Sequence, residues 1–291
     1  MFDKFDKKEI TYPYHIIEGV SVPLNITSQR LDILKKLTLK KGDICVVSHP
    51  RSGSNWLMRI ITLLLCKGEI QHDKTATNSI IYADSYLIDN IDKIDFESFP
   101  SPRLFKMHLP YNFGLGGVPT QTQCKYLYIA RNPKDVVASY YFFEKSQNWW
   151  GKSAISWDTW IEMFIEGISH RGPWSDHVIS WWKHSLISDN ILFIKYEDLI
   201  KNYDFELERI AKFLNISLTS TIHKKLKEKT KIDYMKKDPF YLRDHDKLYN
   251  NIINKGGAGS WSNLFTDDQN KKIYEYYQKN VFSLGLKLDF F

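Results

Sequence analysis

Three short polar segments of the chain carry cations beside small or hydroxylic residues, which suits them to binding anions. The first segment, residues 49–55, holds Arg51 within a run of serine and glycine. Glycine and serine allow a close backbone approach and donate hydrogen bonds, and arginine adds a planar fork of N–H donors. This composition predicts that the first segment binds a phosphate or sulfate group.

The other two segments add a candidate base and a second candidate anion site. Lys106 lies close to His108, whose imidazole is able to accept a proton from a bound molecule. Arg131 precedes Ser139, so that a guanidinium and a hydroxyl could share one phosphate. Each segment taken singly is also compatible with a structural role, because lone histidines often pack in cores and surface cations often pair with acids such as Asp135.

The first segment lacks the pattern of common nucleotide-binding loops. A Walker A loop reads G-x-x-x-x-G-K-[ST], and the chain does not supply this spacing at residues 48–56. A P-loop-like nucleotide or small-molecule kinase is nevertheless kept as an alternative, because it would share the sheet and the anion loop. Such a kinase should also carry an acidic Mg²⁺ ligand after a strand, and no acid stands in a convincing context.

A short apolar run precedes each of the three segments and predicts a buried β-strand. The predicted strands occupy residues 43–48, 103–107, 125–130 and 190–196. Predicted helices alternate with them at residues 56–66, 133–145, 157–168, 174–185, 205–214 and 267–282, the last capped by Thr266. Strands that are apolar throughout are typical of a parallel sheet covered on both faces, with their carboxyl ends at one edge. We therefore predict an α/β fold with a central parallel sheet flanked by helices.

The composition is that of a globular protein. The 291 residues are 43% hydrophobic and 25% charged and include 14 glycines and 10 prolines, which excludes a mostly disordered or collagen-like chain. No repeat or long linker divides the chain, so we predict a single domain over residues 1–291, with an N-terminal segment at 1–42 and a core at 43–291. Residues 71–102 and 241–254 lack a clear period and are interpreted as loops or lids.

Charge and cysteine usage restrict the possible partners. The 40 Lys+Arg exceed the 34 Asp+Glu by 6, which permits an anionic ligand, yet the cations are dispersed, so a nucleic-acid binder is a weaker alternative. Cys45, Cys66 and Cys124 are too far apart for a disulfide framework or a thiolate metal site, and we expect no metal. Without a membrane-length apolar run or a signal-peptide core, the sequence predicts a cytoplasmic protein with no membrane partner.

The order of six motifs along the chain is more specific than any one of them. Residues 48–56, S-H-P-R-S-G-S-N-W, resemble the T-Y-P-K-S-G-T-T-W of cytosolic sulfotransferases. Residues 106–110, K-M-H-L-P, and 129–141 resemble that family's K-T-H-L-P and A-R-N-x-K-D-x-x-x-S-Y-Y. Three shorter matches follow at residues 196–199, 234–239 and 255–261, so that the resemblance extends from about residue 43 to 289.

The resemblance implies a P-loop-kinase-like sulfotransferase fold and a reaction. The family moves the sulfuryl group of 3′-phosphoadenosine 5′-phosphosulfate (PAPS) onto a hydroxyl or amine, here of a small-molecule acceptor, and leaves 3′-phosphoadenosine 5′-phosphate (PAP). By this resemblance His108 is the general base, while Lys106 and Arg51 offset negative charge on the sulfuryl group and the leaving oxygen.

The resemblance also assigns residues to each part of the donor. The residues expected to bind the 5′-phosphosulfate end are Arg51, Ser52, Gly53, Ser54 and Asn55. Those expected to surround the adenine are Trp56, Tyr196 and Thr230. The residues expected to bind the 3′-phosphate are Arg131, Ser139, Lys255 and Gly256. Asn254 is expected at the same phosphate, where the family usually has an arginine.

Several positions depart from the family pattern. Arg51 replaces a lysine and cannot give up a proton, so we do not expect acid catalysis by this residue. Ser260 and Ser262 replace an aspartate and a lysine of the last motif. Together with Asn254, these changes predict weaker donor binding through that loop and a larger share for Arg131.

The sequence leaves the oligomeric state and the acceptor open. The family's dimer motif, K-x-x-x-T-V-x-x-x-E, keeps only its threonine, Thr266, so the family dimer is not expected from the resemblance. Phe143 matches a position that lines the acceptor pocket, whereas Trp149, Trp150 and Trp157 are equally compatible with that pocket and with the core.

Overall fold

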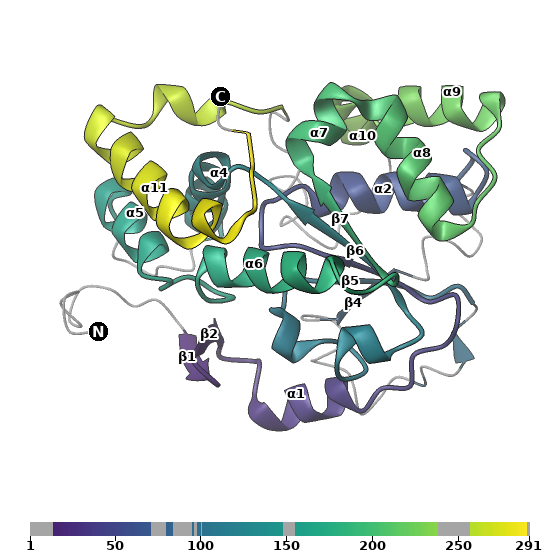
Figure 1. Ribbon diagram of the computed structural model, residues 1–291, viewed down its shortest axis with the longest axis horizontal. Coiled ribbons are helices and arrows are strands. Elements are labelled where there is room, and N and C mark those ends of the chain that lie inside the picture. Colours follow the sequence, from purple (N-terminus) through teal and green to yellow (C-terminus); the bar gives the residue numbers. More distant parts are fainter. Residues whose placement is uncertain are drawn as a thin grey trace.

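A five-stranded parallel sheet forms the centre of the computed structural model (Figure 1). The structure describes residues 14–70, 80–83, 95, 98–99, 101–147, 155–237 and 257–289. The strands lie in the order β4 (Ile80–Tyr82), β5 (Leu104–Met107), β3 (Ile44–Val47), β6 (Lys125–Ala130) and β7 (Ile191–Lys195). Four of them confirm the predicted strands. β4 corrects the interpretation of residues 71–102 as loops, because a three-residue strand is too short to show a period.

Both faces of the sheet are covered by helices, as the continuous apolar runs predict. Ile44 and Val46 of β3 pack with the apolar residues of one layer, and Cys45 and Val47 between them pack with those of the other. The first layer is made of α2 (Ser54–Leu65), α7 (Tyr196–Lys201), α8 (Tyr203–Leu214) and α9 (Ser220–Lys229). The second contains α1 (Ser28–Lys35), α4 (Pro133–Ser146), α5 (Trp157–Ile165), α6 (Trp174–Ser185) and α11 (Asp267–Asn280), and Figure 1 shows α4, α5 and α11 side by side.

Local sequence signals explain where the long helices begin. Pro133 opens α4, and the Asn132 side chain accepts a hydrogen bond from the Lys134 N–H at 2.9 Å. Thr266 caps α11 in a capping box with Gln269. Thr266, the residue of the family's dimer motif that this chain keeps, therefore has a local structural role. The six predicted helices are confirmed within a few residues at their ends. The helices α1, α7, α9 and α10 (Ile232–Lys237) were not predicted.

The described part of the N-terminal segment packs on the same core. A hairpin of β1 (Tyr14–Ile17) and β2 (Val20–Pro23) precedes α1. The Ser21 carbonyl accepts the Arg171 N–H at 2.7 Å, and the Ser21 hydroxyl donates to the Gly167 carbonyl at 3.2 Å. Ile17 and Val22 are buried in the larger apolar cluster. The hydrophobic core therefore also includes residues that precede residue 43, where the predicted core begins.

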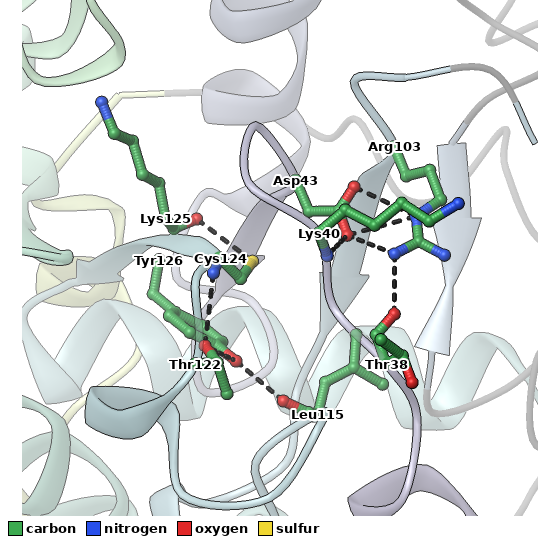
Figure 2. Close-up of polar contacts among 9 residues, drawn as sticks. All are labelled: Thr38, Lys40, Asp43, Arg103, Leu115, Thr122, Cys124, Lys125 and Tyr126. Atoms are coloured by element: carbon green, nitrogen blue, oxygen red, sulfur yellow. Dashed lines mark hydrogen bonds and ion pairs between the residues drawn. The ribbon is translucent and has the colours of Figure 1, made fainter. Parts of the chain in front are cut away.

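A buried ion pair joins β3 and β5 at the amino edge of the sheet (Figure 2). Arg103 Nε donates to both carboxylate oxygens of Asp43, at 3.0 and 3.1 Å, and Arg103 Nη2 donates to the same carboxylate and to the Thr38 carbonyl. The Lys40 N–H donates to Asp43 Oδ2 at 2.7 Å. This network satisfies two fully buried charges at the edge opposite the predicted site.

No helix in the described part of the chain is both long and apolar enough to cross a membrane.

Candidate functional site

The loop between β3 and α2 has two residues in the left-handed backbone conformation, which restricts the side chains that these positions tolerate. Gly53 precedes α2 with φ of 103°, and a Cβ added there would lie 2.5 Å from the Tyr196 ring. Arg51 also adopts a left-handed conformation, with φ of 70°. No side chain caps the N-terminus of α2, which begins at Ser54, and the positive end of the helix dipole lies at this loop. An anion is therefore favoured at this end of the helix.

The candidate base and its neighbouring cation lie beside this loop. His108 Nδ1 lies 2.8 Å from the Ser48 carbonyl, which accepts a hydrogen bond, so Nδ1 carries the proton and Nε2 is the basic nitrogen. Lys106 Nζ donates to Asn55 Oδ1 at 2.5 Å. The parallel pairing of β3 with β5 brings these residues together. The structure thus places Lys106, His108 and Asn55 at one end of the sheet.

The side chain of Arg51 lies against the third predicted segment. Its Nε donates to Ser139 Oγ at 3.1 Å, and its guanidinium carbon lies 4.7 Å from the centre of the Phe143 ring. The Arg51 carbonyl accepts a hydrogen bond from Arg131 Nη1 at 3.3 Å. Burial, and then the charge of Arg131, lower the pKa of Arg51 to about 10, so Arg51 is still a cation at neutral pH. An anion between them would relieve their repulsion.

Arg131 connects this cluster to the last predicted motif. Its Nη2 donates to the Gly257 carbonyl at 2.8 Å and lies 3.6 Å from Asp135 Oδ1. The buried Asp135 carboxylate also accepts hydrogen bonds from the Gly259 N–H at 2.9 Å and the Ser260 hydroxyl at 3.2 Å. Asp135 therefore fixes the start of the described part of this loop to α4. Asn254, Lys255 and Gly256, which the sequence assigns to the 3′-phosphate, lie outside the described residues.

Aromatic side chains from three helices meet beside the anion loop. The Trp56 ring lies 5.5 Å from Tyr196 and stacks against Tyr203 at 6.1 Å with an interplanar angle of 22°. The Tyr203 hydroxyl pairs with Thr230 Oγ1 at 2.8 Å. Burial raises the pKa of Tyr203 to about 12, so its hydroxyl stays protonated. These contacts bring together the three residues predicted to surround adenine and add Tyr203, which no motif in the sequence indicated.

A buried carboxyl group supports the end of β6. The Asn132 N–H donates to Glu197 Oε1 at 2.8 Å, linking the residue after Arg131 to the start of α7. Burial is the main cause that raises the pKa of Glu197 to about 7. The side chain therefore holds the polypeptide that carries Arg131 and does not act as a permanent negative charge.

Unsatisfied polar atoms in the cluster test whether the residues fit the donor implied by the resemblance. Ser52 Oγ, Arg131 Nε and Trp56 Nε1 are buried and have no hydrogen-bond partner among the described residues. Such atoms in a native fold call for an explanation, and a ligand rich in acceptor oxygens and ring nitrogens supplies one. Two arginines, a glycine-containing loop at a helix N-terminus and an aromatic pocket together fit a nucleotide with two anionic ends.

The residues predicted near the acceptor fall into different parts of the molecule. Phe143 lies under Arg51 at the site. Trp157 instead packs with Tyr141 at 5.2 Å and Phe265 at 5.2 Å, and its Nε1 donates to Gln269 Oε1. Trp157 therefore belongs to the helical layer that contains α4, α5 and α11. Trp149 and Trp150 lie outside the described residues.

Among the described residues, no group of three or more His, Cys, Asp or Glu side chains is arranged to hold a metal ion.

Comparison with known proteins finds one family over most of the chain. The model of the sulfotransferase domain matches residues 41–285. Sulfotransferase 1B1 of Canis lupus familiaris is 32% identical over 256 residues, covering 83% of this chain and 84% of the relative. Sulfotransferase 1C2 of Oryctolagus cuniculus is 29% identical and covers 94% of each chain.

Solved structures agree with this assignment. The crystal structure of mouse sulfotransferase SULT7A1 complexed with PAP is 27% identical, with a TM-score of 0.74 and coverage of 92% of this chain and 94% of that chain. Retinol dehydratase in a complex with retinol and PAP has a TM-score of 0.78 over 96% of this chain and 93% of its own. At 22% identity, the latter similarity supports the fold alone.

Proposed function

Because the chain belongs to the sulfotransferase family and uses PAPS as its sulfuryl donor, we propose that it sulfates a hydroxyl or amine of a small-molecule acceptor with His108 as general base. The observation that carries this role for His108 is its hydrogen bond to the Ser48 carbonyl, which leaves Nε2 as the basic nitrogen. His108 stands beside Lys106 at the end of the strand next to the anion loop.

The described residues suggest how the donor is held. Ser52, Gly53 and Ser54 would offer backbone and hydroxyl donors to the 5′ end, and the rings of Trp56 and Tyr196 would enclose the adenine. Arg131 and Ser139 would hold the 3′-phosphate. The guanidinium of Arg51 lies with these two residues, so we assign it to the 3′-phosphate, while its backbone serves the 5′ loop.

Each residue at the reaction centre has a separate task. The bound donor supplies a sulfuryl group on a phosphate that is able to leave. His108 Nε2 would take the acceptor's proton while Nδ1 keeps its hydrogen bond to Ser48, which stabilises the charge gained by the imidazole. Lys106, held by Asn55, would stabilise negative charge that develops during transfer. The Arg51 guanidinium, which we assign to the 3′-phosphate with Ser139, has no task at the reaction centre in this proposal, unlike the charge-offsetting role that the resemblance implies.

Other aspects of the function rest on the sequence and the relatives. Phe143 matches a family position that lines the acceptor pocket, and its aromatic ring would suit a ring-bearing acceptor. A relative from Danio rerio is named cytosolic sulfotransferase 1, which supports a cytoplasmic location. The kinase alternative has no observation in its favour, since the matched family and the PAP-bound neighbour are both sulfotransferases.

A labelled-donor assay tests the proposal. The protein is incubated with ³⁵S-labelled PAPS and a panel of phenols, alcohols and amines, and His108→Ala is compared with His223→Ala, a change on the outer part of α9. We expect His108→Ala to lose about 10²-fold or more in kcat with PAP affinity retained, and His223→Ala to behave as the unaltered protein. Unchanged turnover in His108→Ala would remove His108 from the mechanism.

A further inference from the structure

Four residues from four parts of the chain, Ser48, His108, Tyr128 and His177, form a hydrogen-bond network behind His108. His177 Nε2 lies 3.0 Å from the His108 carbonyl, and since a carbonyl only accepts, Nε2 carries the proton. His177 Nδ1 then accepts from the Tyr128 hydroxyl at 2.8 Å. His108 Nδ1 in turn donates to the carbonyl of Ser48.

Two carbonyl acceptors place the protons in this network, one on His108 Nδ1 and one on His177 Nε2. Ser48, His49, Tyr128 and His177 are fully buried, so water does not compete for these hydrogen bonds. The His49 ring lies edge-on to His177 at 5.5 Å. Burial, and then the proximity of His177, lower the pKa of His49 well below its usual range, so that His49 is neutral. The network therefore allows one tautomer of His177 and one of His108.

The network joins the ends of β5 and β3 to β6 and α6. His108 follows β5, Ser48 and His49 follow β3, Tyr128 lies in β6 and His177 lies in the first turns of α6. A shift of His108 relative to Ser48 would break the hydrogen bond that keeps the proton on Nδ1. In water the Nε2–H tautomer of histidine predominates, and that form has no lone pair on Nε2 to accept a proton.

We propose that His177 is a positioning residue for sulfuryl transfer, which keeps His108 in the Nδ1–H tautomer by holding its carbonyl group, with Tyr128 orienting His177. This inference rests on the proposed role of His108 as the base. It assigns function to a buried histidine that belongs to none of the six motifs. The bond between His177 and the main chain means that His177 acts through His108.

Matched substitutions distinguish this role from a general contribution to folding. In His177→Gln the side-chain amide reaches about as far as Nε2 and is able to donate to the His108 carbonyl, whereas in His177→Asn it is too short. Tyr128→Phe removes the hydroxyl that orients His177 and serves as a second, more conservative variant. We expect His177→Asn to lower kcat roughly 10- to 100-fold with PAP affinity unchanged. His177→Gln should keep most of the kcat of the unaltered protein, and the kcat of Tyr128→Phe should lie between those of the two His177 variants.

A spectroscopic measurement gives a readout that a merely structural residue would not change. The ¹⁵N shifts of the His108 ring, identified by the loss of its signals in His108→Ala, distinguish the Nδ1–H from the Nε2–H tautomer. We expect Nδ1–H in the unaltered protein and in His177→Gln, and a substantial Nε2–H population in His177→Asn. Unchanged kcat and an unchanged tautomer in folded His177→Asn would overturn the inference. An active His108→Ala would instead refute the base assignment and leave the tautomer measurement valid.

Discussion

Replacement of Arg51 by glutamine tests whether its guanidinium serves the 3′-phosphate. Arg51 Nε is bound to Ser139, and Arg131 is close enough to lower the Arg51 pKa, which places two cations beside one anion site. A hydrogen bond to a charged group contributes about 1.5–3 kcal/mol, which corresponds to roughly 10- to 150-fold in affinity. Arg51→Gln should therefore weaken binding of PAP by that factor.

Calorimetric titration with two ligands identifies the phosphate concerned. Adenosine 5′-phosphate lacks the 3′-phosphate, so its affinity should change little in Arg51→Gln while that of PAP falls. Arg131→Gln should show the same pattern, and Arg209→Gln, a change in a pair with Glu206 on α8, should leave both affinities unaltered. Equal losses of affinity for PAP and for adenosine 5′-phosphate in Arg51→Gln would contradict our assignment. They would indicate instead that the Arg51 guanidinium binds the 5′ end of the donor.

Three further changes test the fold around the site. Gly53→Ala should abolish donor binding and destabilise the protein, because its Cβ would lie 2.5 Å from the Tyr196 ring, and calorimetry with thermal melting would detect both losses. Asp43→Ala should lower the free energy of unfolding by about 3–5 kcal/mol, since it leaves Arg103 as an uncompensated buried charge; a loss below 1 kcal/mol in urea titrations would argue against a buried pair. The raised pKa of Glu197, about 7, means that its contribution to stability is complete below the unfolded pKa near 4.5 and is lost as pH rises through 7. Glu197→Gln should accordingly gain up to about 3 kcal/mol in stability over the unaltered protein between pH 5 and pH 8, and a pH-independent difference in urea midpoints would refute this.

The sequence predicted the elements whose signals are local. Residues 125–130 and 174–185 are apolar or amphipathic over their whole length, and β6 and α6 have the same bounds in the structure. By contrast, β4 has three residues, and its pairing with β5 depends on contacts distant in sequence. The N-terminal hairpin was missed for the same reason, since Ser21 is held by carbonyl groups near residue 168.

The site was predicted less completely, because motifs identify residues but not the direction of a side chain. Lys106 and His108 lie together beside the first loop, as expected from the parallel strands. The position of Arg51 against Ser139 could not be read from a loop in which it replaces lysine. Tyr203 and His177 stand in no motif that we recognised, and their roles appear only when α8 and α6 pack against the sheet.

The Asp43–Arg103 pair lies at the far end of the strands from the residues that would touch donor and acceptor. The charges that join β3 to β5 are thus separated from the reaction centre by the length of these strands. Loss of the ion pair in Asp43→Ala should therefore lower stability while the folded protein keeps its affinity for PAP.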